Sequence, residues 1–201
     1  MVTMGDEIRA VVKTKAEDQS FYSELKLLVG QGKLINDGIA FAILKNKLKA
    51  MDTATGVLID GYPRTLAEGE MYDLEGLQQG LMVHIQQDEE VILAKLLGRR
   101  VCEGCGANFN VADVTSQGYH LPPQLPKVEG KCDHCGGKLG LRKDDTKRVI
   151  KRRMFEFNVK TLPLEAFYRS KGRLLAYSAV KGVAGYPELL EQVKAKLASL
   201  G

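Results

Sequence analysis

The sequence has no apolar run long enough to span a bilayer and no recognisable signal peptide. Its longest apolar run, Ile39 to Leu44, has six residues, against the roughly 20 that a membrane helix needs. Residues Met1 to Ala10 lack the apolar centre of a signal peptide. There is also no internal repeat and no low-complexity linker. These absences exclude a helical membrane span and a repeat architecture for the residues given.

Composition and charge are those of a soluble globular protein. Apolar residues make up 44% and charged residues 27% of the 201 positions, which suits one domain or one domain with a substantial insertion. The net charge of +4 is a weak argument for nucleic acid, because seven basic residues are concentrated between Arg142 and Arg153.

No cysteine is left over from two Cys-x-x-Cys pairs. Cys102 and Cys105 form the first pair, Cys132 and Cys135 form the second, and 26 residues separate them. Two thiolates on one tight turn converge on a single ion, and four sulfurs complete a tetrahedral zinc site with no open position. The pattern predicts a structural zinc, although redox-active dithiols or disulfides remain alternatives. Reduced thiols favour the cytoplasm or the mitochondrial matrix.

Short apolar runs alternate with helical patterns along most of the chain. The pattern predicts strands at Val57–Ile59, Leu81–Ile85 and Leu174–Ala179. Helices are expected at Asp6–Lys13, Phe21–Val29, Asp37–Met51, Thr65–Gln78, Glu89–Leu97, from Asp144 or Asp145 with a break at Pro163, and at Pro187–Leu200.

This order predicts an α/β fold, with a parallel sheet and helices on both of its faces. Ligands bind such sheets at the carboxyl ends of the strands, so chemistry is expected just after Ile59, Ile85 and Ala179. The cysteine segment interrupts the pattern and is interpreted as a small inserted domain.

An acid and an arginine follow the first predicted strand. Asp60 could hold a magnesium-bound water, and the planar fork of Arg64 suits a phosphate. A structural Asp-Gly turn is the alternative. Arg99, Arg142 and Arg153 stand at the junctions with the inserted segment, as phosphate clamps or as solvated surface charges. Asp144 and Asp145 are expected to orient them.

Several motifs, in this order, resemble the adenylate kinase family. The resemblance covers essentially the whole chain, and members with a zinc-bearing lid carry Cys-x-x-Cys pairs at this point. The motifs are Thr3-Met4-Gly5-Asp6-Glu7-Ile8-Arg9, Gly32-Lys33-Leu34-Ile35, Asp60-Gly61-Tyr62-Pro63-Arg64-Thr65, Gly98-Arg99-Arg100, Arg142-Lys143-Asp144-Asp145 and Arg153.

The resemblance implies a nucleoside-monophosphate-kinase-like fold with reversible phosphoryl transfer from ATP to AMP, giving two ADP. Residues 1–100 and 142–201 would form the core, with an AMP-binding arm at about 4–50 and a zinc lid at 101–141 that closes over ATP.

Residue roles also follow from the resemblance. Arg9 and Arg64 would bind the AMP phosphate, and Leu34 and Ile35 would lie near its base. Asp60 would organise the magnesium shell. The transferred phosphoryl would be surrounded by Arg99, Arg142 and Arg153.

The sequence departs from the family at one large feature and three small ones. It contains no Gly-x-x-x-x-Gly-Lys-Ser/Thr loop, which anchors the ATP phosphates. In the family, the first strand, this loop and the first helix precede the residues that match here, and that strand lies between the strands formed here by Val57–Ile59 and Leu81–Ile85. Met4, Glu68 and Lys95 stand where a threonine, a glutamine and an arginine contact the bases.

Two functions are therefore expected, and a third is weighed. The first is an adenylate kinase whose phosphate loop lies upstream of a truncated sequence. The second is a non-catalytic subunit of a larger, for example mitochondrial, assembly in which another chain fills the missing strand position. For the chain as given, we expect no activity alone, with AMP bound more readily than ATP. The third, a nucleic-acid binder that uses Arg142 to Arg153, lacks an aromatic platform.

Overall fold

The computed structural model describes residues 1–13, 19–31, 33–75, 80–116, 118–142 and 144–200. The chain divides into two compact units, residues 1–80 with 152–172 and residues 81–151 with 173–201, and each is described by itself. No helix among these described residues is both long and apolar enough to cross a membrane.

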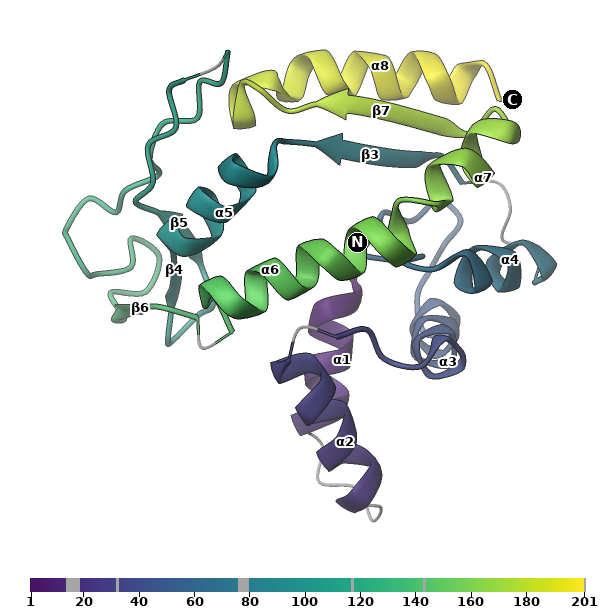
Figure 1. Ribbon diagram of the computed structural model, residues 1–201, viewed down its shortest axis with the longest axis horizontal. Helices are drawn as coiled ribbons and strands as arrows, with labels where there is room; N and C mark the ends of the chain where they lie inside the picture. The colour runs from purple at the N-terminus through teal and green to yellow at the C-terminus, as the bar shows by residue number, and fades with distance from the viewer. Residues whose placement is uncertain (14–18, 32, 76–79, 117, 143, 201) are drawn as a thin grey trace. The chain divides into compact units, whose positions relative to one another are not determined.

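The first unit is mainly helical (Figure 1). It contains one short parallel strand pair. Its elements are β1 (Val2–Thr3), α1 (Met4–Lys13), α2 (Gln19–Gly30), α3 (Asp37–Lys49), β2 (Ile59–Asp60), α4 (Leu66–Leu74), a π-helical turn (Phe157–Thr161) and α7 (Leu164–Ser170), together with the last residues of α6 (Lys147–Glu156), which begins in the second unit.

The strand pair places Asp60 at the end of the first predicted strand. Val2 lies opposite Ile59 and Thr3 opposite Asp60 in parallel register. The predicted strand at Val57–Ile59 is thus shorter and shifted toward Asp60. β1 was not predicted, because its two residues are too few to show a periodic pattern.

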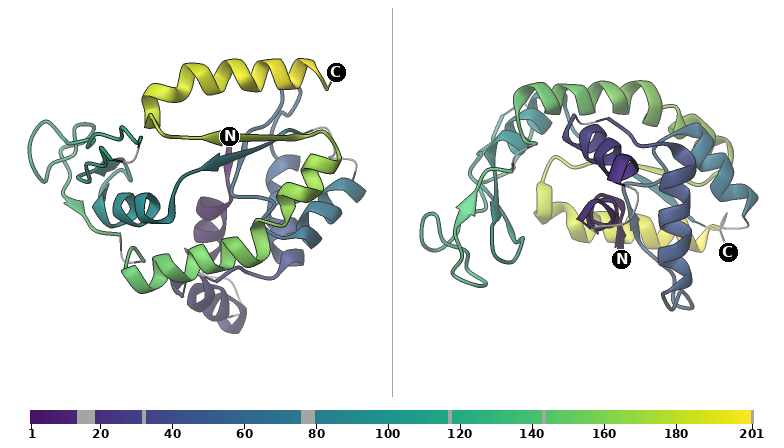
Figure 2. Two further views of the ribbon diagram at one scale, coloured as in Figure 1. Left: turned by 45° about the horizontal axis from the view of Figure 1, so that its top comes forward. Right: turned by 90° about the horizontal axis from the view of Figure 1, so that it is seen from below.

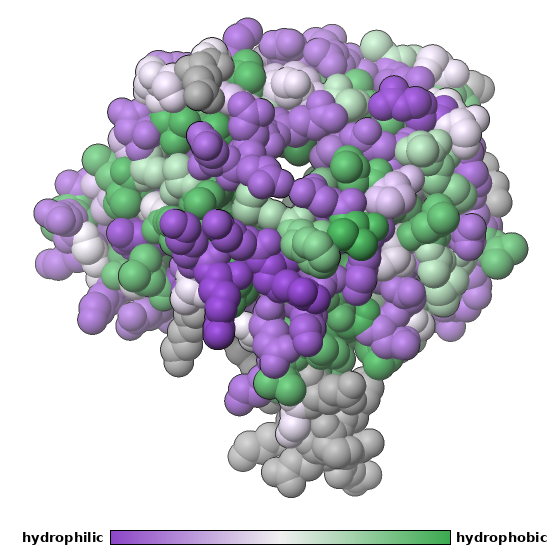
Figure 3. Space-filling model, in the orientation of Figure 1, coloured by the Kyte–Doolittle hydropathy of each residue, from purple (hydrophilic) through white to green (hydrophobic). Residues whose placement is uncertain are grey.

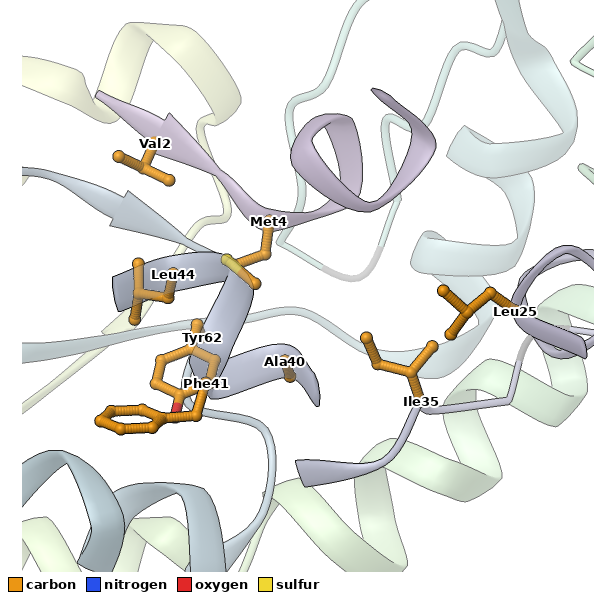
Figure 4. Packing of buried hydrophobic residues seen from close by; sticks show 8 residues of the cluster. All are labelled: Val2, Met4, Leu25, Ile35, Ala40, Phe41, Leu44 and Tyr62. Carbon is orange, nitrogen blue, oxygen red and sulfur yellow. The ribbon is translucent and has the colours of Figure 1, made fainter. Parts of the chain in front are cut away.

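The first unit's core lies between β1 and the first three helices (Figure 4). Met4 and Leu25 are almost fully buried, and Leu44 is 0% exposed. Figure 4 shows Met4 beside Leu44 and the ring of Tyr62 beside that of Phe41. Full burial of a leucine side chain stabilises the fold by roughly 1.5–3 kcal/mol, so this cluster fixes the helices that carry the predicted AMP arm.

Caps define where two of these helices begin. The Asn36 side chain accepts a bond of 2.9 Å from the Gly38 N–H at the start of α3. Thr65 Oγ1 accepts from the Glu68 N–H at 3.1 Å and starts α4. The predicted helix at Thr65–Gln78 ends earlier, at Leu74; the part of that prediction at 76–78 lies outside the described residues.

Pro163 divides the long helical stretch, as the sequence predicts. α6 begins at Lys147, slightly later than expected, and α7 begins directly after Pro163. Before it, the Leu162 N–H reaches back five residues to the Phe157 carbonyl oxygen at 2.8 Å. Because proline has no N–H and cannot continue the α-helical bonding, the chain turns through a wider π-helical turn here.

The second unit joins a parallel strand pair to a small antiparallel sheet (Figures 1 and 2). Its elements are β3 (Met82–Gln86), α5 (Glu89–Gly98), β4 (Arg99–Cys102), β5 (Asn108–Asn110), β6 (Leu139–Gly140), the first residues of α6, β7 (Leu174–Ser178), a 3-10 turn (Gly182–Gly185) and α8 (Tyr186–Ala198).

β3 and β7 confirm two predicted strands to within one residue at each end. They pair in parallel, from Met82 opposite Leu174 to Gln86 opposite Ser178, and α8 lies along β7 in Figure 1. The cysteine segment forms the antiparallel sheet in the order β5-β4-β6.

The alternating pattern predicted one parallel sheet, whereas the described parallel strands form two pairs. β2 pairs with β1 and β3 pairs with β7, and the described residues contain no ladder between β2 and β3. The parallel direction within each pair is as predicted, because helices separate the paired strands in sequence.

Candidate functional site

The four cysteines converge on one point in the second unit. Cys102 at the end of β4 approaches Cys135 with 3.4 Å between the Sγ atoms, and Cys105 approaches Cys132 with 3.5 Å. All four Sγ atoms lie within 4.8 Å of one another. The two Cys-x-x-Cys pairs that the sequence predicted to act together are therefore adjacent.

Both cysteine turns have the same backbone design. The Gly106 N–H bonds to the Cys102 carbonyl at 3.0 Å, and the Gly136 N–H bonds to the Cys132 carbonyl at 2.8 Å. Gly106 and Gly136 have φ of 76° and 70°, in the left-handed region that glycine adopts most readily. A Cβ atom at Gly137 would lie 3.0 Å from the Cys102 sulfur, so a side chain there would require the sulfurs to shift.

The sulfur geometry fits a tetrahedral metal ion. With Zn–S distances of about 2.3 Å, ideal tetrahedral ligands lie about 3.8 Å apart, close to the separations observed. Backbone N–H bonds from Cys105 and Gly104 lower the pKa of Cys102, whereas the neighbouring Cys135 and Cys132 thiols raise the pKa of Cys105. The four sulfurs therefore ionise as one coupled group, and metal binding requires them as thiolates. The cluster could hold a metal ion through these four residues.

The turn after β2 brings Asp60 and Arg64 together. Gly61 has φ of 77°, and Arg64 folds back so that its Nε donates to the Gly61 carbonyl at 2.9 Å. Partial burial lowers the pKa of Arg64, Asp60 opposes that shift and Arg153 adds to it. Three of the residues predicted from the motifs are thus electrostatic neighbours within the first unit.

Glu68 is a buried carboxyl beside this turn. It is 4% exposed, and its Oε2 accepts a bond of 2.6 Å from the Arg64 N–H. Burial raises its pKa to about 7, the Arg64 backbone bond opposes the shift, and Asp37 adds to it. A carboxyl in this setting changes its charge near neutral pH.

Two arginines of the second unit are held by aspartates, as the sequence predicts. Arg99 Nε and Nη2 donate to the two carboxylate oxygens of Asp145 at 2.7 and 2.6 Å. Arg142 makes the same pair of bonds with Asp144 at 2.6 and 2.8 Å. Each pair uses two of the five N–H groups of a guanidinium, so its plane is fixed while other donors can meet an anion. Lys143 of this motif lies outside the described residues.

The predicted AMP arm borders an open cavity of about 630 Å³. Leu34 and Ile35, predicted to lie near the base, line it together with Thr65 and Lys160. Arg9 forms an ion pair with Asp6 one helical turn earlier in α1. Gly32, which precedes this arm's Lys33-Leu34-Ile35, lies outside the described residues.

Met4 and Lys95, two positions that differ from the family, have structural contacts here. Met4 is buried in the core. Lys95 Nζ donates to the carbonyl oxygens of Ala112, Leu121 and Pro122 at 2.8, 2.7 and 3.2 Å. The segment that supplies these carbonyls was assigned no role from the sequence. Its large apolar residues Tyr119 and Leu121, which are buried here, were the available signal.

The fold defines an α/β protein with parallel strand pairs, a polar turn at the carboxyl end of β2 and a metal-competent cysteine cluster. A family model described as adenylate kinase matches residues 1–173. The chain belongs to the adenylate kinase family, which confirms the resemblance drawn from the motifs.

Similar proteins carry that name in bacteria and plants. An adenylate kinase from Caldicellulosiruptor bescii is 36% identical over 205 residues, covering 100% of this chain and 86% of that protein. One from Clostridium botulinum is 35% identical and covers 96% and 83%. A "Probable adenylate kinase 6, chloroplastic" from Oryza sativa subsp. japonica is 35% identical and covers 94% and 67%.

Proposed function

We propose that this chain carries the AMP-binding arm and the lid for reversible phosphoryl transfer between ATP and AMP, giving two ADP. The observation that carries the proposal is the turn after β2, at the carboxyl end of a parallel strand, where such folds bind ligands. Arg64 folds back onto the Gly61 carbonyl in this turn, and it interacts electrostatically with Asp60 and with Arg153 of α6. Phosphoryl transfer depends mainly on positioning and positive charge, which such a group of residues supplies.

The residue roles are proposed as follows. Arg9 and Arg64 bind the AMP phosphate, and Leu34 and Ile35 lie near the base. Asp60 orients magnesium-bound water when Mg²⁺ enters with the nucleotides. The charge on the transferred phosphoryl is stabilised by Arg99, Arg142 and Arg153.

Base choice is proposed to involve Glu68. A protonated carboxyl offers one O–H donor and one acceptor oxygen, as a glutamine amide does for adenine, whereas the carboxylate only accepts. Since the pKa of Glu68 is raised to about 7, AMP should bind more tightly below neutral pH than above it.

The metal is proposed to be zinc, held by Cys102, Cys105, Cys132 and Cys135. With four thiolate ligands, the ion would stabilise the folded lid rather than take part in the reaction. Residues 101–141 are proposed as the lid and about 4–50 as the AMP arm, with residues 1–100 and 142–201 as the core.

A second candidate is a non-catalytic subunit that another chain completes. The observation that favours it is that residues 1–201 hold no phosphate-loop motif, while the described parallel strands form only two separate pairs. A strand of a partner could complete such a sheet. This candidate predicts AMP binding without turnover.

A coupled ADP-formation assay separates the two candidates. It should compare the 201-residue polypeptide with a version extended upstream in its transcript. Activity only in the extended form supports the kinase; activity in neither, with AMP bound in calorimetry, supports the subunit. Turnover by the 201-residue form would contradict the expectation that it is inactive alone.

Arg64→Ala tests the AMP site directly. It should weaken AMP binding at least tenfold, because a charge-assisted phosphate bond contributes about 1.5–3 kcal/mol. Arg169→Ala, which removes an exposed i,i+4 ion pair with Glu165, is the matched control. Equal AMP affinity in both variants would contradict the assigned role.

The compartment stays a prediction. Reduced cysteines favour the cytoplasm or the mitochondrial matrix, and two of the similar plant proteins are named as chloroplastic.

A further inference from the structure

The segment Ala112–Pro122, here called the strap, is tied to α5 by one lysine. Its position 117 lies outside the described residues. Lys95 Nζ donates to carbonyl oxygens at both ends of the strap, Ala112 at 2.8 Å and Leu121 at 2.7 Å, and to Pro122 at 3.2 Å. Burial lowers the pKa of Lys95, while Asp113 opposes the shift. One ammonium group thus bonds to both ends of the segment, which are also joined by two backbone hydrogen bonds between Val114 and Leu121, of 3.1 and 2.9 Å.

The C-terminal part of the strap is bonded to residues that follow both parallel strands in the second unit. Tyr119 Oη accepts a bond of 2.9 Å from the Asp88 N–H, two residues after β3 ends. The His120 N–H donates to the Val180 carbonyl at 2.8 Å, two residues after β7 ends. These bonds place the strap directly at the carboxyl ends of β3 and β7.

Apolar side chains fill the space beneath the strap. Tyr119 is 8% and Leu121 4% exposed, and they pack with Val91 and Val180. A Cβ atom at Gly182 would lie 2.9 Å from Leu121 Cδ2, so Leu121 is in close contact with the turn after β7. The contact is a packed interior rather than a loop resting on a surface.

We propose that Tyr119–Leu121 is an autoinhibitory plug, which occupies the ligand-binding end of the β3–β7 sheet and must be released before a nucleotide base can bind there. Parallel α/β sheets bind ligands just beyond the carboxyl ends of their strands, and the sequence itself predicted chemistry just after Ile85 and Ala179. In this structure the chain's own side chains take that position.

Lys95 holds this plug in place through its hydrogen bonds to the strap carbonyls, and it acts as a positioning residue. Replacing it leaves the three carbonyl oxygens without their shared donor, which favours strap conformations in which water satisfies those oxygens. A ligand that competes with the plug binds only in the released state, so its apparent affinity is reduced by the fraction of molecules in that state. Releasing the strap should therefore tighten binding without any new contact.

The test uses the full 201-residue chain, with Lys95→Met as the releasing variant. Lys194→Met, which removes an exposed lysine of α8 paired with Glu191, is the control. Tyr119→Phe, which removes only the bond from Asp88, is a milder second variant in case Lys95→Met folds poorly. Hydrogen exchange reports strap opening, and ligand-detected NMR with ATP as the probe reports binding.

We expect exchange at the His120 and Leu121 amides to rise at least tenfold in Lys95→Met, less in Tyr119→Phe and not in Lys194→Met. ATP affinity should rise in the same order, by at least threefold in Lys95→Met. An unchanged or weakened ATP affinity despite faster exchange would overturn the plug, since the strap would then be neutral or part of the site. Unchanged exchange would overturn the role of Lys95.

The choice of ATP as the probe rests on the proposed function. AMP binding, measured in the same samples, distinguishes a failure of the proposed function from a failure of the plug, because the predicted AMP residues belong to the first unit. Loss of AMP binding in every form would count against the proposed function, whereas normal AMP binding with no gain in ATP affinity would count against the plug alone.

Discussion

At the scale of single residues, the notable positions are charged or polar side chains that are buried. Glu68 is the clearest, because its carboxyl is buried and accepts the Arg64 backbone N–H at 2.6 Å. The family motifs alone identify Glu68 as unusual, because a glutamine is usual at this position. Only the burial of the side chain shows that its charge is coupled to folding.

Glu68→Gln should remove a pH dependence of stability. The pKa is about 7 in the folded state, against an ordinary 4.5, so the folded state binds more protons between these values. Stability should therefore fall as pH rises from about 4.5 to 7, by about 3 kcal/mol at most, and then level off. Urea unfolding from pH 4.5 to 8 measures this; a wild-type slope equal to that of the glutamine variant would contradict it.

Leu44→Ala should destabilise the first unit through a cavity. Leu44 is 0% exposed within the core of β1 and the first three helices. Comparable leucine truncations cost about 2.7–5 kcal/mol. Leu74→Ala, at an 85% exposed position of α4, is the control and should change the urea midpoint little. A small effect at Leu44 would mean that the core relaxes around the lost atoms.

At the scale of elements, the cysteine turns and the helix caps follow from local sequence. Glycines at positive φ shape both cysteine turns, and Asn36 and Thr65 cap α3 and α4 through their own side chains. The surface of α6 is strongly hydrophilic (Figure 3), with Lys147, Arg148, Lys151 and Arg152 exposed. Those basic residues form a solvated helix face, on which the Arg152 guanidinium lies 5.3 Å from the centroid of the Phe155 ring.

Gly137→Ala should weaken metal binding at the cysteine cluster. Its Cβ would lie 3.0 and 3.2 Å from the sulfurs of Cys102 and Cys135, which are closer than ordinary contacts, so the ligands must shift. Gly80→Ala, whose Cβ would meet nothing within 4 Å, is the control. Competition for zinc with a chromophoric chelator measures the change; equal zinc affinity in the two variants would contradict a tightly packed site.

At the scale of the whole molecule, each unit has its own hydrophobic clusters. The largest, around Leu44 and Met4, belongs to the first unit, whereas the cysteine cluster and the strap belong to the second. The predicted ligand-binding region after β2 thus belongs to the first unit, and the region after β3 and β7 belongs to the second. The stability of one need not follow that of the other.

Metal removal should therefore act locally. Chelation of a zinc-loaded sample should speed hydrogen exchange between residues 99 and 141 and leave exchange of the α1 and α3 amides unchanged within about twofold. The reason is that the cysteine ligands lie in the second unit and the α1–α3 core lies in the first. Faster exchange throughout both units would show instead that the metal stabilises the whole chain.

The sequence by itself determined the α/β pattern, the positions of β3 and β7 to within one residue, the two cysteine turns and the family. These features depend on local periodicity, ligand spacing and the order of motifs, all of which can be read from neighbouring residues in the sequence. Tertiary structure alone decided that β1 pairs with β2, that the described parallel strands form two pairs, that Glu68 is buried, and that Lys95 bonds to the strap. Each of these depends on which distant residues exclude water from a side chain or satisfy a backbone group, and no local pattern records that.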